Sequence, residues 1–399
     1  MLLLTGGASE GDGTPLEVES GGDSPIIWFI FLLSYSMSLF LLALRWKRTF
    51  YVLSKNKLIL VLLIFTLASV LWSVSPDITL RRVIALAGTT FFGCYLAVSY
   101  SLKQLLQLLA WTFAVSIILS FIFIIVLPKY GTMGGTHTGV WRGIYVHKNG
   151  LGKTMVASAI VFLLLALDAN KNSLVLWSGF FSSIVLLVSS KSTTSLLTLI
   201  AMIAIIPMCR TFRWRYEVMI PTLISIILLS SISLTVLTSN SEFFLLFLGK
   251  DPTLTGRTDL WITIFNKVLQ HPLLGYGFNA FWLGWNSEAS DIWRIVGWTA
   301  PNAHNGWLDL LLDLGFLGAS IFILVFGVTL VNALAQIRWS QTFTSLFPLL
   351  NIMYLTISNI GESKLLRHHD INWVVYVAVS LLISIPRKNP YETGLTKAN

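Results

Sequence analysis

The chain has 399 residues, of which 55% are hydrophobic and only 11% are charged, and its mean hydropathy is +0.76. A typical soluble protein carries about 25% charged residues, so this composition excludes a soluble globular body and predicts an integral membrane protein. The formal net charge is +9, but no basic soluble domain is present that would bind nucleic acid, and basic residues of a membrane protein usually lie in its loops.

The first segment, residues 1–25, is rich in glycine, serine and acidic side chains and contains no lysine or arginine. Such a segment buries too little apolar surface to fold alone, and it lacks the basic start and apolar core of a signal peptide. We therefore expect a disordered acidic N-terminal tail at 1–25. Residues 26–386 are expected to form a single transmembrane domain, followed by a cytoplasmic C-terminal tail at 387–399.

Apolar segments of roughly membrane-spanning length follow one another along the rest of the chain. Each must be helical, because lipid offers the backbone no hydrogen-bond partners. At about 20 residues per span, we predict an all-α polytopic protein of about eleven transmembrane helices, within a range of roughly ten to twelve. The expected spans are 26–44, 57–73, 83–99, 104–127, 151–167, 174–189, 194–208, 218–237, 305–333, 344–360 and 371–386.

The orientation follows from the basic clusters at 45–57, 210–215 and 387–397, which come directly after odd-numbered spans. Because lysine and arginine are enriched in cytoplasmic loops, we place these clusters inside. The opposite, outer face then carries a large loop at 238–304. It also carries the shorter outer loops at 74–82, 128–150, 190–193 and 361–370.

The outer face carries nearly as many cations as the inner face, against the usual bias. Cations near the headgroup plane on this side point to an anionic ligand such as a lipid phosphate. The alternative is that long side chains simply reach for the interface, and Lys191 has a further alternative, a tight turn with capping hydroxyls. The outer cations include Arg81, Arg82, Arg142, Lys148, Lys191 and Arg257, and several of the outer cations lie within a few residues of a span end.

Two outer loops have a composition suited to binding a glycan. The loop at 128–150 mixes glycines with Trp, Tyr, Arg, His and Lys, and the loop at 238–304 contains five tryptophans that could stack on sugars. Within the larger loop, 258–270 has apolar residues at helical spacing and ends at His271-Pro272. This pattern predicts an interfacial or lid helix.

The stretch from Ala303 to Gly315 closes the longest polar segment and opens a long apolar one. His304 is therefore at a boundary between water and lipid, where a histidine suits general-base chemistry near neutral pH. Asp309 and Asp313 follow on one helix face. They could orient His304, pair with an arginine, or act only as polar groups at the helix mouth. Glu362, close to further cations, is another carboxylate of this kind.

Other common sites are missing from the sequence. It has no Walker loop, no His-Glu-x-x-His and no Gly-x-Ser-x-Gly, and Gly275-Tyr276-Gly277 lacks the strand and third glycine of a dinucleotide site. Cys94 and Cys209 do not have metal-ligand spacing, and we interpret both as packing residues. We therefore expect no cofactor and no metal. A base, a set of arginines and a tryptophan-rich loop fit glycosyl transfer from a lipid diphosphate to a hydroxyl.

Three short segments resemble the O-antigen ligase and polysaccharide polymerase superfamily of bacterial membrane proteins. They are 141–152, 256–261, and 275–277 together with 303–315, and the likeness extends over roughly 130–360. The resemblance implies a GT-C-like helical fold and metal-independent transfer of a glycan from an undecaprenyl-diphosphate carrier. The acceptor hydroxyl would belong to a glycan or lipid at the periplasmic face of the inner membrane, with the chain acting as ligase or polymerase.

The resemblance also assigns roles. It implies His304 as the base and Arg142 and Arg257 as diphosphate ligands, and Lys148 lies inside the first matching segment. Arg81, Arg82 and Lys191 are added from charge placement alone, while Asn305, Asp309, Asp313 and Glu362 are expected to support the site. Members of the superfamily commonly have about twelve spans with both ends inside, whereas we count about eleven with an outer N-terminus.

A rival hypothesis is a polytopic transporter or flippase of a lipid-linked oligosaccharide. Such proteins have internal repeats and charged or broken-helix sites near the bilayer midplane. The spans here are almost free of charge except near their ends, and the polar loops gather on one face. This asymmetry favours an enzyme that works at one surface. A purely structural scaffold would leave the outward cations unexplained.

Overall fold

The computed structural model describes residues 25–135, 138–169, 173–211, 217–218 and 257–386. These residues form helices and loops without any strand, apart from an isolated bridge between Thr132 and Trp141, which confirms the all-α prediction. Apart from edge residues, the predicted tails and the span at 218–237 lie outside this described part. The elements are α1 (Pro25–Leu44), α2 (Trp46–Lys55), α3 (Leu58–Ala68), η2 (Ser69–Leu71), α4 (Pro76–Ser99), α5 (Leu102–Val126), α6 (Pro128–Gly131), α7 (Lys148–Leu167), α8 (Ser173–Ser189), α9 (Thr193–Thr211), α12 (Arg257–Gln270), α13 (Ala289–Val296), α14 (Gly306–Trp339), η5 (Thr344–Leu346), α15 (Phe347–Ser358) and α16 (Ile371–Ser384).

Every expected span that falls on described residues coincides with a helix, but two helices begin earlier than predicted. α4 starts at Pro76, a residue whose fixed φ suits the first turn, so Arg81 and Arg82 lie in the helix and not in an outer loop. α7 starts at Lys148, because the His147 side chain accepts a hydrogen bond from the Asn149 amide and caps the helix. Cations predicted in loops are thus fixed to helix starts.

Four described helices, α4, α5, α7 and α14, are long and apolar enough to cross a membrane. The pair formed by α1 and α2, which is bent by 97°, would make a fifth span. The other apolar helices are shorter, with 10–17 residues. The outer faces also expose large apolar side chains such as Trp111, Ile118 and Ile125 on α5. These features agree with a polytopic membrane protein but do not confirm eleven spans.

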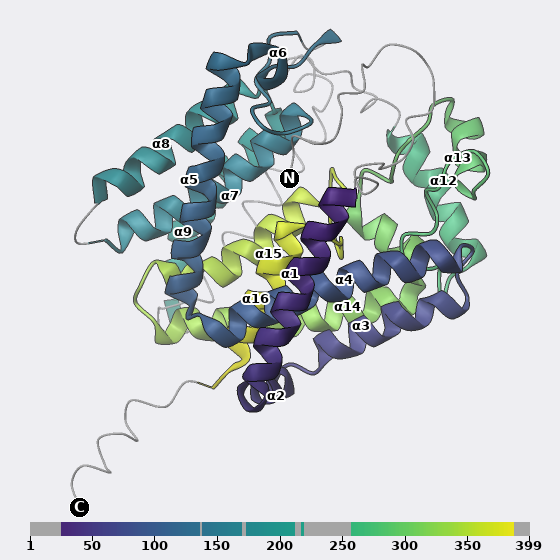
Figure 1. Cartoon of the computed structure of the whole chain (residues 1–399), viewed down its shortest axis with the longest axis horizontal. Helices are drawn as coiled ribbons and strands as arrows, with labels where there is room; N and C mark the ends of the chain where they lie inside the picture. Colours follow the sequence, from purple (N-terminus) through teal and green to yellow (C-terminus); the bar gives the residue numbers. More distant parts are fainter. Residues whose placement is uncertain (1–24, 136–137, 170–172, 212–216, 219–256, 387–399) are drawn as a thin grey trace, which may run out of the picture.

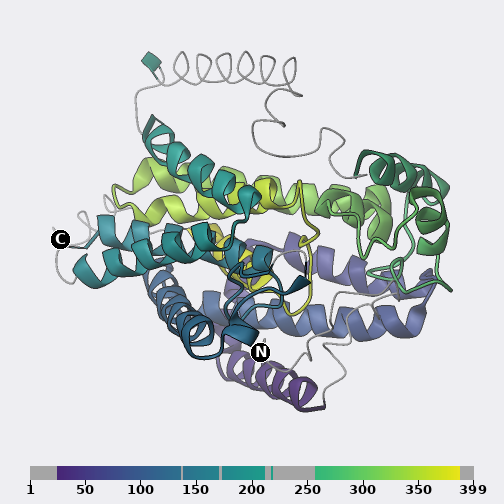
Figure 2. The same ribbon diagram turned by 90° about the horizontal axis from the view of Figure 1, so that it is seen from above.

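Three hydrophobic cores hold together the helices whose arrangement is drawn in Figures 1 and 2. The first packs α5, α7, α8 and α9 against α15, and the second packs α1 to α4 against α14 and α16. The third lies at the opposite end of the molecule from α8 and belongs to α12, α13 and the loops around them. α14 contributes to all three cores, so it connects the third core to the rest of the molecule.

α14 is broken near its start. Gly315 has φ 62° and ψ −169°, a conformation that is open essentially only to glycine. Immediately after it, the Phe316 amide donates to the Pro272 carbonyl at 2.7 Å and the Leu317 amide to the Leu273 carbonyl at 3.2 Å. The expected span at 305–333 therefore consists of a short segment, 306–314, joined at a kink to a long helix.

The loop between α12 and α13 is a packed unit. α12 confirms the helix predicted at 258–270. It buries Leu260, Ile264 and Val268, and Lys267 pairs with Glu288 at 3.0 Å and Asp291 at 2.6 Å to hold α13 against it. The Lys267 pKa is raised although burial opposes this, because both carboxylates stabilise the ammonium. The predicted long periplasmic loop is thus, in its described part, a small folded body.

Candidate functional site

His304 lies in the loop just before α14. Its backbone is left-handed, with φ 48°, a strained conformation for a residue with a side chain. The Asn302 side-chain oxygen accepts its amide hydrogen bond at 2.9 Å, and Trp298 stacks on its ring with a centroid distance of 6.0 Å. The neighbours of His304 hold it in this position.

Ala303, the residue before His304, is fixed on both sides of its peptide. Its carbonyl accepts a hydrogen bond from Trp261 Nε1 of α12 at 2.9 Å. Its amide donates to the Asp309 carboxylate at 3.2 Å, and Trp282 Nε1 donates to the same carboxylate at 2.8 Å. The sequence left several roles open for Asp309. In the structure it binds the backbone just before His304, and its carboxylate does not form a hydrogen bond with the imidazole.

Two residues that follow His304 attach it to its surroundings. Asn305 connects it to α14, and Gly306 connects it to the loop between α15 and α16. The Asn305 side-chain oxygen caps α14 by accepting from the Trp307 amide at 3.0 Å and the Leu308 amide at 3.3 Å. The Gly306 amide donates to the carbonyls of Asn359 and Glu362, both at 2.9 Å. His304 is thereby placed beside the loop at 359–370, which comes from a distant part of the sequence.

Charged side chains converge on this junction. Lys153 of α7 forms an ion pair with Glu362. Arg257, the first residue of α12, reaches the same loop, since a Cβ at Gly361 would lie 3.7 Å from Arg257 Nη1. The charges of Arg257, Glu362 and Lys153 all act on the imidazole of His304. The structure thus brings together two residues that the resemblance assigned, His304 and Arg257, with the predicted Glu362.

The pKa of His304 is lowered, chiefly because the ring is partly buried and secondly because Arg257 and Lys153 disfavour a further positive charge, while Glu362 opposes the shift. A lowered pKa leaves the imidazole neutral at physiological pH, and a general base must be neutral to accept a proton. The environment of His304 therefore suits it to this role.

A second group of predicted residues lies beneath this junction. Asp313 is buried one helical turn beyond Asp309, and its charge acts on Arg82 of α4. Arg82 Nη1 donates to the carbonyl of Asn279, in the loop that follows α12. Asp313 also accepts a backbone hydrogen bond from Asn279, so Arg82 and Asp313 bind the same residue from two helices. Arg82 and Asp313 together hold the 271–288 loop between α4 and α14.

The remaining predicted cations are not joined to this junction by any interaction within the described chain. Arg142 donates to the carbonyls of Tyr130 at 3.0 Å and Val146 at 3.2 Å, which shapes its own loop. Lys148 begins α7, and Arg81 is exposed on α4. Lys191 is exposed in a tight turn with φ 48°, between the buried hydroxyls of Ser190 and Ser192, as its turn alternative describes.

Trp261 of α12 holds the Ala303 carbonyl, and the other four tryptophans of the large loop form two groups. Trp282 and Trp293 are buried in the third core and donate their indole N–H groups to Asp309 and to the Ala300 carbonyl. These two side chains are structural, not sugar-stacking surfaces. Trp285 and Trp298 are exposed, and Trp298 lies against His304, where it remains available to a ligand.

Lys153 is the residue of this junction that sequence reasoning missed. It stands near the start of the apolar run at 151–167, and a lysine inside such a run with no acidic residue close in sequence is a signal of a distant partner.

The histidines at 368 and 369 do not belong to this charged junction. Burial lowers the pKa of His368 to about 3 and that of His369 to about 4. His369 bonds Tyr35 at 2.6 Å, which attaches α1.

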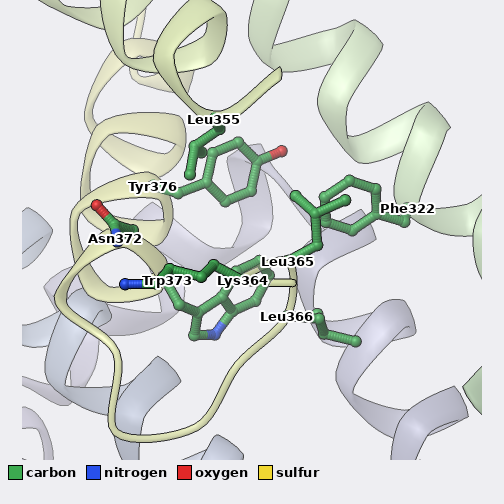
Figure 3. A pocket seen from close by; sticks show the side chains of 8 residues that line it. All are labelled: Phe322, Leu355, Lys364, Leu365, Leu366, Asn372, Trp373 and Tyr376. Carbon is green, nitrogen blue, oxygen red and sulfur yellow. The ribbon is translucent and has the colours of Figure 1, made fainter. Parts of the chain in front are cut away.

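Two hollows lie near these residues. An open apolar groove between α12 and the start of α14 is lined by Trp261, Ile262, Phe265, Asn266, Asn305 and Leu308, so it adjoins His304. A small second pocket is lined by the stacked aromatic rings of Phe322, Trp373 and Tyr376 and by residues 364–366 of the 359–370 loop (Figure 3). Among the described residues, no group of three or more His, Cys, Asp or Glu is placed to hold a metal ion.

Comparisons with known proteins agree with the resemblance drawn from the motifs. The family model described as O-antigen ligase matches residues 178–323, a region that contains Arg257 and His304. The exopolysaccharide production protein ExoQ of Rhizobium meliloti (strain 1021) is 25% identical over 277 residues. That match covers 66% of this chain and 61% of the relative, so the chain spans less than two thirds of the relative's length.

Both findings support the resemblance to the O-antigen ligase and polysaccharide polymerase superfamily. They support a function of the ligase or polymerase kind, and with it a glycosyl-transferring enzyme. The apolar helices and the family match together indicate a membrane protein.

Proposed function

We propose that this chain is a membrane glycosyltransferase that moves a glycan from an undecaprenyl-diphosphate carrier to an acceptor hydroxyl, without a metal ion. The observation that carries this proposal is the convergence of His304, Arg257 and Glu362 at the start of α14. A neutral base beside fixed cations is what one in-line displacement with a diphosphate leaving group requires.

In this mechanism His304 removes the proton of the acceptor hydroxyl. The acceptor oxygen then bonds to the anomeric carbon of the donor sugar, and the bond from that carbon to the diphosphate oxygen breaks with its electron pair. Arg257 holds the departing diphosphate by charge-assisted hydrogen bonds, which are strong and can be bidentate. Arg142 and Lys148 are proposed as further ligands, with Arg81, Arg82 and Lys191 as outer anion contacts.

The supporting residues act through the backbone and the local charge. Asp309 accepts the Ala303 amide just before His304, and Asn305 caps α14 just after it by accepting the Trp307 amide. The negative charge of Asp313 acts on Arg82, and Glu362 favours a proton on His304. The groove between α12 and α14 is apolar and opens beside Asn305, so it is a suitable place for the isoprenoid part of a donor that arrives from the membrane.

We also propose the topology on which the site depends: a single GT-C-like domain at 26–386 with about eleven spans, tails at 1–25 and 387–399, and a periplasmic loop at 238–304. Hydrogen bonds between loops support the alternating scheme. Val74 bonds Tyr276 at 3.0 Å on the proposed periplasmic side of the inner membrane. Phe343 bonds Asp168 at 2.7 Å on the cytoplasmic side. Both bonds join segments that alternation assigns to the same side.

The proposal is tested by replacing the gene with variants and profiling the cell's glycans. His304→Ala should reduce glycan transfer by about 10²- to 10⁴-fold, the usual contribution of a positioned base, while the protein still inserts into membranes. His271→Ala is the matched control, since this exposed histidine ends α12 away from the charged junction, and it should retain transfer.

Normal transfer by His304→Ala would remove the base assignment. The deletion strain separates the two activities of the superfamily. Loss of chain elongation identifies a polymerase, whereas accumulation of a complete lipid-linked polymer identifies a ligase.

A further inference from the structure

Lys153 is an almost fully buried cation with one direct ionic partner in the described chain. Its side chain is 9% exposed and lies on α7, the most buried of the candidate spans. Removing a charge from water costs several kcal/mol, and a buried ion pair is often no more stabilising than apolar packing. Simple stability therefore does not explain why a lysine occupies this position.

Its partner, Glu362, is at the centre of the proposed site. The Glu362 side chain is 28% exposed, three times as much as that of Lys153, so the pair has one buried end and one open end. The Glu362 carbonyl accepts a hydrogen bond from the Gly306 amide, close to His304 in the chain. Gly361, the residue before Glu362, lies against Arg257 Nη1. The loop that carries Glu362 therefore lies beside Arg257, so an anion held by Arg257 would be close to the pair of Glu362 and Lys153.

Cations outnumber carboxylates around Glu362. Lys364 repels Lys153, and Asp370 attracts it, but the Asp370 carboxylate is already bonded to the Asn372 amide at 2.7 Å, where it caps α16. Lys153 thus pairs directly with Glu362, Arg257 lies against Gly361, and Lys364 follows in the same loop, with Asp370 as the other carboxylate that acts on Lys153. Such an excess of positive charge is suited to a ligand with more than one negative charge.

We propose that Lys153 is a further ligand of the donor diphosphate, and that Glu362 is an internal counter-ion which neutralises it while the site is empty. This inference rests on the proposed function. When the diphosphate binds beside Arg257, it competes with the Glu362 carboxylate for the Lys153 ammonium. When the diphosphate leaves, Glu362 pairs with Lys153 again, so the buried cation is never left without an anion.

Competition and simple bracing predict opposite results for the two partners. If Glu362 competes with the diphosphate, Glu362→Gln should strengthen diphosphate binding and Lys153→Met should weaken it. If the ion pair only braces α7 against the loop, each single variant leaves one buried charge without its partner, and both variants should weaken binding together.

In the experiment, the purified full chain in detergent is titrated with farnesyl diphosphate, and calorimetry measures the heat of binding. We expect Lys153→Met to weaken binding by about tenfold or more, the usual effect of losing a charged hydrogen bond, and Glu362→Gln to strengthen it several-fold. Lys103→Met, which removes an exposed charge at the start of α5, is the matched control and should bind as the wild type does.

The double variant Lys153→Met/Glu362→Gln keeps the test decisive if Lys153→Met fails to fold, because it leaves no unpaired buried charge. Relative to Glu362→Gln, it should again bind about tenfold or more weakly. Equal affinities of these two variants, or weaker binding by both single variants, would overturn the inference. Glycan transfer by His304→Ala is measured separately. Loss of transfer in that variant shows whether the proposed function holds, independently of the binding result.

Discussion

His304 is strained in a way that its neighbours maintain. A left-handed backbone conformation at a residue other than glycine costs of order 1 kcal/mol or more, and such strain persists only where the surroundings fix it. Here Asn302 accepts the amide of His304, while Trp261 and Asp309 hold the peptide before it. This conformation turns the imidazole toward Trp298 and the charges of Arg257 and Glu362.

The charges around His304 predict how its activity depends on pH. The base acts when neutral, so activity should rise with pH through its pKa, which burial and Arg257 hold below the ordinary value of 6.5. Arg257→Met removes a cation that disfavours protonation, so the acidic limb of kcat/KM should move to higher pH. Glu362→Gln removes the opposing anion, and the limb should move to lower pH.

The measurement is the pH profile of kcat/KM for glycan transfer, which reports the free enzyme. Lys103→Met changes the net charge by the same amount as Arg257→Met, but at a position away from the site. It should leave the acidic limb of the profile unchanged. Identical profiles for all variants would show that His304 is not the titrating base.

At the scale of elements, two glycines of α14 determine where the helix can lie. Gly315 takes the conformation that breaks the helix against the 272–274 loop. Gly306 allows the first turn to approach the loop after α15 so closely that a Cβ would collide with Asn359 Oδ1. Because Asn359 also accepts the Lys364 amide at 2.7 Å, the start of α14 and the 359–364 loop form one unit.

Gly306→Ala should therefore separate α14 from this loop. We expect a loss of about 1–3 kcal/mol of stability, as for other overpacked sites, together with a lower transfer rate because His304 and Glu362 move apart. Gly327→Ala is the control within the same helix, since a Cβ there meets no atom within 4 Å. It should be neutral or stabilise by up to about 1 kcal/mol.

Thermal unfolding in detergent and glycan transfer measure the two effects. A melting temperature and transfer rate of Gly306→Ala equal to those of Gly327→Ala would contradict the close packing of this junction.

At the scale of the whole molecule, α14 joins the packed α12–α13 unit to the helices of the membrane domain. The charged junction lies where α7, α12, α14 and the loop after α15 meet. A site built from four separate elements depends on the relative position of both parts of the molecule. The proposed topology places all four contributions at the periplasmic face.

Labelling of single cysteines tests this topology. With Cys94 and Cys209 replaced by alanine, Lys191→Cys should react with a membrane-impermeant maleimide from the periplasm. Lys103→Cys should react only after the inner membrane is opened. Both side chains are exposed in the structure, so burial does not confuse the result. Labelling of Lys103→Cys from the periplasm would reject the alternating scheme.

Composition and hydrophobic patterning already determined the helical membrane class and the positions of most helices, and they singled out His304 as a candidate base. These properties depend on residues that are neighbours in the chain: apolar runs need helices in lipid, and a polar boundary exposes the histidine. Arg257 was found from the resemblance, because it lies in the segment at 256–261 that is similar to a known family. Glu362 was found from its place at a predicted span end.

Only the tertiary structure decided which of these residues meet. It paired Glu362 with Lys153, turned Asp309 toward the Ala303 amide, buried Trp282 and Trp293, and left Arg142 in its own loop. None of these outcomes is fixed by local pattern, because each depends on packing between helices far apart in sequence. Burial also sets the energy of a charge, so which ionic partners matter is known only once the helices are in place.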